Sequence, residues 1–175
     1  MLRGLFVTAL VVLLTGCQSA YYSAMEKAGV HKREILVDRV DAARGAQQEA
    51  QEQFVDALQQ FRSVVQFDGG ELETLYDQLQ EEYDDSAAAA EDVRNRIDKV
   101  EDVAEALFEE WQAELDEYTN QRLRNQSARQ LRDTRQRYGQ LIRAMQRGEK
   151  RMDPVLNTLK DNVLYLKHNL NAQAI

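Results

Sequence analysis

The sequence predicts an all-α protein, an elongated antiparallel helical bundle or coiled-coil hairpin of three to four long helices. Three observations favour this fold class. The chain has 175 residues, 30% of them charged, with one proline and eight glycines, a composition typical of one domain built from long, surface-rich helices. Apolar residues recur at alternating steps of four and three along most of the chain, as in a heptad repeat. Gly69 and Gly70 interrupt this repeat, and paired glycines supply the backbone freedom that a tight reversal needs.

The first 16 residues have the pattern of a cleaved lipoprotein signal peptide. Arg3 gives a positive start, and residues 5–14 form a nearly unbroken apolar run, as in a secretory signal. That run is about half of the roughly 20 apolar residues that a membrane-spanning helix needs. We therefore expect this segment to be removed, and not to remain as a transmembrane anchor.

Cys17 is the only cysteine in the chain and ends the stretch Leu14-Thr15-Gly16-Cys17. This stretch looks like a lipobox, in which small residues precede a cysteine that is acylated. A lipoprotein cysteine of this kind carries three acyl chains, and two lipid signals already suffice for stable anchoring. Cys17 is therefore the predicted lipidation site; the alternative is a buried or incidental cysteine after an ordinary signal.

Gln18 follows Cys17 at the position where lipoproteins retained at the inner membrane have aspartate. The sequence thus indicates the cell outer membrane, with the protein anchored by its lipid and facing the periplasm. Residues 17–31 are interpreted as a lipid-anchored tether, with the rings of Tyr21 and Tyr22 at the lipid interface. Residues 32–175 are interpreted as the helical coiled-coil domain.

Two heptad registers define the long helices. The first begins at Lys32 and comprises Leu36, Val40, Ala43, Gln47, Ala50, Phe54, Ala57, Phe61 and Val64. The second follows the glycine pair and comprises Leu72, Tyr76, Leu79, Tyr83, Ser86, Ala90, Val93, Ile97, Val100, Ala104, Leu107, Trp111, Glu114 and Tyr118. At 1.5 Å per residue the second helix would be roughly 70 Å long, which favours a coiled-coil rod.

Two further helical segments follow. Ser127 and Gln130 resemble a capping box that opens a third helix, and Asp153 and Pro154 resemble the N-cap and first position of a fourth; the two segments could equally form one kinked helix. Their apolar positions are Leu131, Tyr138, Leu141, Ile142, Met145 and Met152, then Leu156, Leu159, Val163, Leu166 and Leu170. No glycine or proline follows Leu170, so we expect either a fraying end or a C-terminally incomplete domain.

Charge is unevenly distributed along the chain. Residues 68–118 contain 19 acidic and 3 basic residues, whereas residues 119–151 contain 2 acidic and 10 basic residues. If these segments fold back on each other, opposite charges lie along one seam and disfavour wrong registers. Alternatively, the arginine-rich segment binds nucleic acid or anionic lipid head groups. Because the net charge is −8, we expect no nucleic acid partner.

No set of residues in the chain indicates a reaction. The sequence has no phosphate-binding glycine loop, dinucleotide fingerprint or Gly-x-Ser-x-Gly elbow, so we expect no enzyme, no catalytic residues and no cofactor. Neighbouring carboxylates such as Glu81 and Glu82 point in different directions around a helix, so no metal site is expected. His31 and His168 are interpreted as surface histidines. Trp111 is interpreted as core packing, with a ligand platform as the alternative.

Several stretches of the chain resemble one protein family. They are the lipobox, residues 23–40, Phe67-Asp68-Gly69-Gly70, and residues 100–108 and 156–171, which together are similar to a proteobacterial lipoprotein family catalogued as domain of unknown function 2959. The resemblance implies a secreted helical lipoprotein with no established activity or catalytic residues. Members of that family continue with a further amphipathic helix that this sequence lacks.

The sequence favours a non-enzymatic, lipid-anchored envelope protein that acts as an elongated helical spacer or a protein-interaction module. Its acidic helix face and heptad seams would bind an envelope protein or peptidoglycan. A missing C-terminal helix would leave one seam uncovered, which predicts self-association through Leu159, Val163, Leu166 and Leu170. The alternative is a periplasmic lipid or small-molecule carrier with a cavity lined by Tyr76, Leu79, Tyr83 and Trp111.

Overall fold

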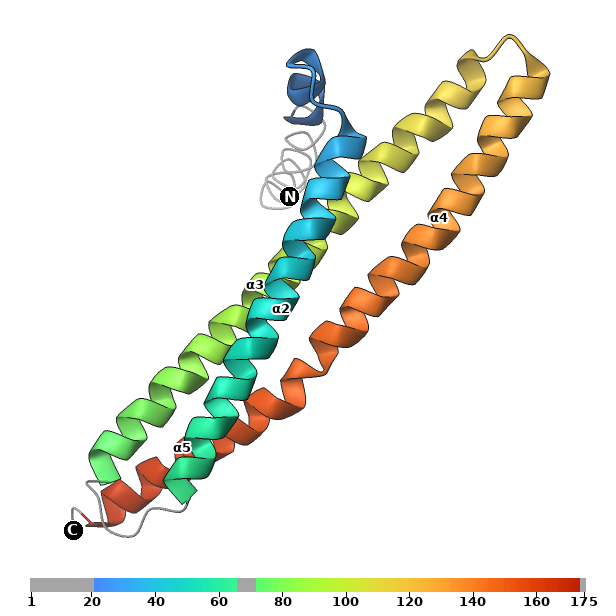
Figure 1. Ribbon diagram of the computed structural model, residues 1–175. Helices are drawn as coiled ribbons and strands as arrows, with labels where there is room; N and C mark the ends of the chain where they lie inside the picture. The colour runs from blue at the N-terminus through green and yellow to red at the C-terminus, as the bar shows by residue number, and fades with distance from the viewer. Residues whose placement is uncertain (1–20, 66–71, 174–175) are drawn as a thin grey trace, which may run out of the picture. The chain divides into compact units, whose positions relative to one another are not determined.

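The computed structural model describes residues 21–65 and 72–173 (Figure 1). These residues form the long helices α2 (Lys32–Val65), α3 (Leu72–Glu114), α4 (Gln121–Lys150) and α5 (Met152–Gln173), with a 3₁₀ turn, η1 (Leu115–Glu117). The described part of the chain contains no strand. The predicted all-α class with four long helices is therefore confirmed.

The chain divides into two compact units, each of which has its own interior. Of the described residues, unit 1 comprises 21–40 and 100–137, and unit 2 comprises 41–65, 72–99 and 138–173. Unit 1 therefore holds the start of α2, the end of α3 and the first half of α4. Unit 2 holds the rest of these three helices together with α5.

A helical segment that includes residues 21–27 precedes α2 in unit 1. It ends in a Schellman motif: the amide of Val30 donates to the carbonyl of Met25 over 2.9 Å, and the amide of Gly29 donates to the carbonyl of Glu26 over 2.9 Å. Gly29 has a φ of 86°, a left-handed conformation that only glycine adopts cheaply. The amide of His31 then donates to the Glu34 carboxylate over 3.4 Å, half of a capping box at the start of α2.

The helical residues 21–27 contribute to the interior of unit 1. Tyr22 is 7% exposed and packs in one apolar cluster with Ile35 and Val103. Met25 and Val30, the two residues joined by the Schellman bond, pack against the same cluster. The prediction that Tyr22 lies at a lipid interface is therefore wrong, whereas Tyr21 is 45% exposed. Burial, followed by the nearby Asp102 carboxylate, raises the pKa of Tyr22.

The heptad registers identify the core of each unit. In unit 2 the buried positions of the two registers are Ala43, Ala50, Phe54, Ala57, Leu79, Ser86, Ala90, Val93 and Ile97, and α4 and α5 add Ile142, Met145, Leu159 and Val163. In unit 1 the α3 register continues with Val100 and Ala104, and α4 adds Leu131. The described residues of both predicted seams are buried or half-buried as far as Trp111.

Side-chain contacts show which helices pair inside unit 2. Gln53 and Gln60 of α2 both donate to the Glu82 carboxylate of α3, and Gln47 of α2 donates to the carbonyl of Met145 in α4 over 2.9 Å. Arg94 of α3 reaches Glu149 near the end of α4. The glycine pair proposed as the reversal between α2 and α3 lies outside the described residues.

The connection between α3 and α4 lies in unit 1 and differs from the prediction. The second register was expected to reach Tyr118, but α3 ends at Glu114, and both Glu114 and Tyr118 are exposed. The helix α4 begins at Gln121, not at Ser127. Its N-cap is Asn120, whose side-chain oxygen accepts from the amides of Arg122 and Leu123 over 3.0 and 3.2 Å.

A single residue separates α4 from α5. Arg151 is a turn residue, and its amide donates to the carbonyl of Gly148 over 3.2 Å, the three-residue spacing of a tightened last turn. The helix α5 begins at Met152, so Asp153 and Pro154 lie in its first turn. The fourth segment thus starts two residues before the predicted first position, Pro154, and the two segments are separate helices (Figure 1).

Candidate functional site: an acidic row on α3 and an arginine face on α4

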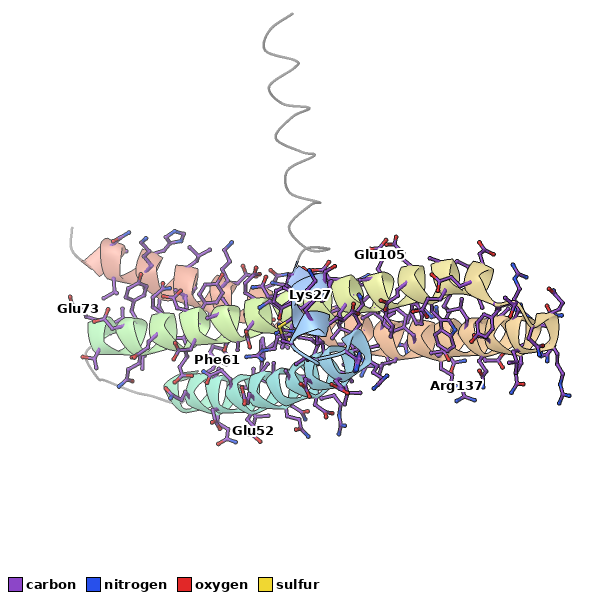
Figure 2. All side chains as sticks on the ribbon, turned by 90° about the horizontal axis from the view of Figure 1, so that it is seen from above. Lys27, Glu52, Phe61, Glu73, Glu105 and Arg137 are labelled. Atoms are coloured by element: carbon purple, nitrogen blue, oxygen red, sulfur yellow. The ribbon has the colours of Figure 1, made fainter. Side chains whose placement is uncertain are left out.

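Carboxylates line the solvent side of α3 in unit 2. Asp77, Asp84, Glu91 and Asp98 follow one another at intervals of seven residues, and all four are exposed. Residues seven apart lie two turns apart on one helix face, at about 10.5 Å. We call these four residues the acidic row. The same spacing reaches Glu105 in unit 1, and the side chains of Glu73 and Glu105 stand free of the ribbon in Figure 2.

The acidic row is hardly neutralised within its own unit. Asp77 and Asp98 have no hydrogen-bond or ion-pair partner among the described residues. Glu91 contacts Arg94 at 3.4 Å, and Asp84 accepts a hydrogen bond from Gln80 over 3.0 Å. The row therefore presents almost its full negative charge to solvent.

Glu82 is a second kind of carboxylate on α3, because it is half-buried. It accepts hydrogen bonds from the side-chain amides of Gln53, over 3.2 Å, and Gln60. Burial, followed by repulsion from Asp85, Asp56 and Glu81, raises its pKa. The side-chain amides of Gln53 and Gln60 thus bind a carboxyl group whose ionisation is disfavoured by burial and by acidic neighbours.

The arginines of α4 in unit 1 fall into two groups, and the first group binds the end of α3 and the turn η1 that follows it. Arg124 donates to the carbonyl of Leu115 over 3.2 Å and to the Asp116 carboxylate over 3.0 Å. Arg135 donates to the carbonyl of Phe108 over 3.1 Å, and its guanidinium lies 5.5 Å from the centre of the Phe108 ring. These arginines stabilise the hairpin through backbone oxygens and a ring as much as through charge.

The second group faces solvent. Its members, which we call the arginine face, are Arg122, Arg129, Arg132 and Arg137. All four are exposed, and none has an ion-pair partner among the residues that the structure describes. Figure 2 shows Arg137 extending away from its helix.

The predicted seam of opposite charges is therefore incorrect in detail. Of the α4 arginines in unit 1, Arg124 pairs with an acid, Asp116. The members of the arginine face have no such partner among the described residues. In unit 2 the pairing is reversed, because Arg94 is a base of the acidic segment and holds two acids of α4 and α5. Its guanidinium contacts Glu149 at 2.8 Å and Asp153 at 2.6 Å.

A buried lysine closes the start of α2 in unit 1. The Lys32 ammonium bonds to the carboxylates of Glu26 and Glu110, the latter at 3.0 Å, and its side chain is 10% exposed. The hydrogen bond from Lys32 is the main reason that the pKa of Glu26 is lowered. Burial alone would lower the pKa of Lys32, but the bonds to Glu26 and Glu110 outweigh it and leave that pKa raised.

A cavity of about 380 Å³ lies beside this lysine. Its lining residues are Glu26, His31, Lys32, Arg33, Leu107, Glu110, Trp111 and Glu114. Trp111 is half-buried, and its indole nitrogen donates to the Ser127 hydroxyl over 2.8 Å. Ser127, predicted as a helix cap, is instead the acceptor that holds the tryptophan.

The other sequence-derived sites have these positions. Trp111 lies in unit 1, whereas Tyr76, Leu79 and Tyr83, the other three residues of the carrier hypothesis, belong to unit 2, where Leu79 is 1% exposed. His31 and His168 are exposed residues of different units. Cys17, the predicted lipidation site, lies outside the described residues.

The apolar seam predicted for self-association is not exposed. Leu159 and Val163 are 0% and 4% exposed inside unit 2, and Leu166 and Leu170 are half-buried. The prediction is therefore wrong for these residues. The apolar residues that α5 does expose include Tyr165, at 68%.

The described residues contain neither a metal-binding cluster nor a membrane-spanning helix. No group of three or more histidine, cysteine or acidic side chains there could hold a metal ion. No helix in the described ranges is long and apolar enough to cross a membrane.

Comparison with known proteins places the chain in a family. A family model described as protein of unknown function (DUF2959) matches residues 21–175. The chain belongs to this family. No curated protein and no solved structure matches it. The family match begins at Tyr21, which is also the first residue that the structure describes.

The residues that sequence reasoning missed are Lys32, Arg94 and Asn120. Asn120 had a usable signal, since asparagine is a preferred N-cap residue and stands where the apolar spacing lapses. Lys32 and Arg94 had none, because their partners Glu110 and Glu149 are 78 and 55 residues away.

Proposed function

We propose that this chain is a non-enzymatic, lipid-anchored module of the cell envelope that binds a partner through the acidic row of α3. Its long helices would serve as a spacer between the lipid on Cys17 and that partner. The observation that supports the proposal best is the row itself: four exposed carboxylates, regularly spaced and hardly neutralised within their own unit.

The acidic row is difficult to explain as a device for stability. Like charges three or four residues apart destabilise a helix, and α3 contains such pairs around the row, for example Glu73 with Asp77 and Asp77 with Glu81. Ordinary surface helices intersperse lysine or arginine at such positions. A cationic partner would relieve this repulsion, so a binding surface explains the arrangement better than a merely solvated one.

The side chains of Lys32 and Arg94 each bind several carboxylates within the protein. Lys32 is bonded to two carboxylates and Arg94 contacts three. Such groups hold helices together and are not available to a substrate. This supports an interaction role over catalysis.

Photo-crosslinking in intact cells tests the proposal. Probes at Glu81, Asp92 and Glu105 on the exposed side of α3 should capture a recurrent envelope protein or a peptidoglycan fragment. A probe at Lys160, which is exposed on α5, serves as the control and should not capture the same partner. Equal capture from both helices would contradict the proposal, and lipid recovered with the purified chain would favour the carrier function.

A further inference from the structure

We propose that the partner of the acidic row is a second copy of this chain, which binds it through the arginine face of α4. This inference rests on the proposed function, since it names the partner of the same surface. Each copy carries both surfaces, the acidic row in unit 2 and the arginine face in unit 1. Neither surface finds adequate counter-charges among the described residues of its own unit.

The spacing of the two surfaces matches. Arg122 and Arg129 are seven residues apart, so their side chains leave α4 on one face about 10.5 Å apart, and the members of the acidic row repeat at the same distance. Arg132 and Arg137 extend the basic surface to about 22 Å, which fits within the roughly 31 Å from Asp77 to Asp98.

The choice of residues favours carboxylate binding. The basic residues of this face are arginines, whose planar guanidinium binds a carboxylate through two parallel hydrogen bonds. A polyanion such as nucleic acid would be repelled by the acidic row and by the net charge of −8. A second copy also carries a net charge of −8, but it presents its carboxylates as a discrete row at the same spacing as the arginines, so short-range pairing can outweigh the overall repulsion.

The contact is predicted to be weak, sensitive to salt and heterologous. Exposed ion pairs contribute little each and are screened by salt. Confinement of lipid-anchored copies to one membrane would raise their local concentration, which favours such weak contacts. Because the two surfaces differ, each bound copy keeps one of them free, so further copies can add to form a ring or an open chain.

Charge reversal gives a specific test on the full chain in a neutral detergent. An arginine-face variant carries Arg122→Glu with Arg129→Glu, and an acidic-row variant carries Asp84→Arg with Glu91→Arg. A control variant carries Lys160→Glu with Lys167→Glu, which reverses two exposed lysines that are also seven residues apart, on α5. Circular dichroism establishes that each variant keeps its helical content.

Sedimentation velocity measures the outcome. We expect the unmodified chain and the control variant to associate at low salt and to dissociate at high salt. Each of the other two variants should be monomeric at low salt, and their equimolar mixture should associate again. A monomeric unmodified chain at low salt, association that is insensitive to salt, or a mixture that stays monomeric would each overturn the inference.

Two further results separate this inference from the proposed function. If the probes on α3 capture a different envelope protein while the purified chain stays monomeric, the second copy is the wrong partner and the interaction module stands. Flotation of the unmodified chain and the arginine-face variant with vesicles of phosphatidylethanolamine and phosphatidylglycerol tests whether the arginine face binds anionic lipid. Binding that is lost in the arginine-face variant, without any self-association, would assign that face to lipid and overturn the inference.

Discussion

The indole nitrogen of Trp111 lies 2.8 Å from the hydroxyl of Ser127, so the end of α3 is hydrogen-bonded to the first half of α4. Ser127 is 7% exposed, which shields this bond from competing water. Trp111 is also the only tryptophan of the chain. Its fluorescence therefore reports directly on the hairpin of unit 1.

We expect Ser127→Ala to lower the free energy of unfolding by about 1 kcal/mol, because the half-buried indole N–H loses its acceptor. Trp111→Phe removes the donor together with apolar volume and should cost more. Urea unfolding followed by circular dichroism measures both variants and the double variant. Additive effects in this double-mutant cycle would show that the hydrogen bond contributes nothing.

Gly29→Ala should destabilise the chain by about 1–2 kcal/mol, because a Cβ is disfavoured in the left-handed conformation. The matched control is Gly45→Ala, inside α2, where alanine should stabilise the helix by about 0.5–1 kcal/mol. An added Cβ meets nothing within 4 Å at either glycine. Opposite shifts of the thermal midpoint would isolate the backbone effect; shifts of the same sign would refute it.

Arg94→Gln should destabilise unit 2 by about 1 kcal/mol, since one guanidinium joins α3 to both Glu149 and Asp153. Arg96→Gln is the control, because Arg96 pairs with Asp92 on its own helix and should cost about 0.3–0.5 kcal/mol. Urea midpoints compare the two variants. Arg94→Lys should not restore stability, because a single ammonium group cannot bind Glu149 and Asp153 at once in the geometry of the planar guanidinium.

Glu82→Gln should stabilise the chain at neutral pH. The folded pKa of Glu82 is raised, chiefly by burial, so the folded state binds a proton more readily than the unfolded state. Its contribution to stability is therefore favourable at acidic pH and is lost as the pH rises through the folded pKa. Glutamine removes this cost: its single side-chain oxygen can accept from one of Gln53 and Gln60, and its NH2 group can donate to the other once that side-chain amide turns its oxygen inward. Urea unfolding at neutral and mildly acidic pH should show a gain that shrinks on acidification, whereas Glu81→Gln, at an exposed position, should show none.

The contact of Lys32 with Glu26 should make unit 1 sensitive to both extremes of pH. The lowered pKa of Glu26 means that its contribution is present at neutral pH and lost as the pH falls below the usual glutamate value of about 4.3. The raised pKa of Lys32 means that its contribution is lost only above the usual lysine value of about 10.4. Trp111 fluorescence should report both transitions. Lys32→Met should weaken both, and an unchanged pH profile in that variant would contradict the assignment.

The heptad spacing predicted the fold and most of the core because helical period is a local property of the chain. Positions such as Leu79, Val93 and Ala104 are buried where the register placed them. The end of α3 was misjudged because Glu114 and Tyr118 continue the heptad spacing, although both side chains are exposed. Spacing alone cannot detect where a neighbouring helix ends.

The charged contacts could not be predicted from segment totals. A surplus of acids in one segment and of bases in the next shows attraction on average, but it does not show which side chains face the partner helix. Arg124 and Arg135 turn toward the hairpin, while Arg122 and Arg129 turn to solvent. That division depends on the rotation of α4 about its axis, which the packing of Leu131 and Ser127 determines.

The position of Tyr21 in the chain limits how far the folded structure could stand from a lipid on Cys17. The helix that ends at the Gly29 motif includes Tyr21, and only residues 18–20 separate Tyr21 from Cys17. An extended chain covers at most about 3.5 Å per residue, so a lipid on Cys17 would hold Tyr21 within roughly 14 Å of the point of attachment. Screening at physiological salt acts over about 8 Å, which is shorter than this reach. The membrane's own surface charge would therefore act on a nearby group such as Lys27 only when the chain between Cys17 and Tyr21 is less than fully extended.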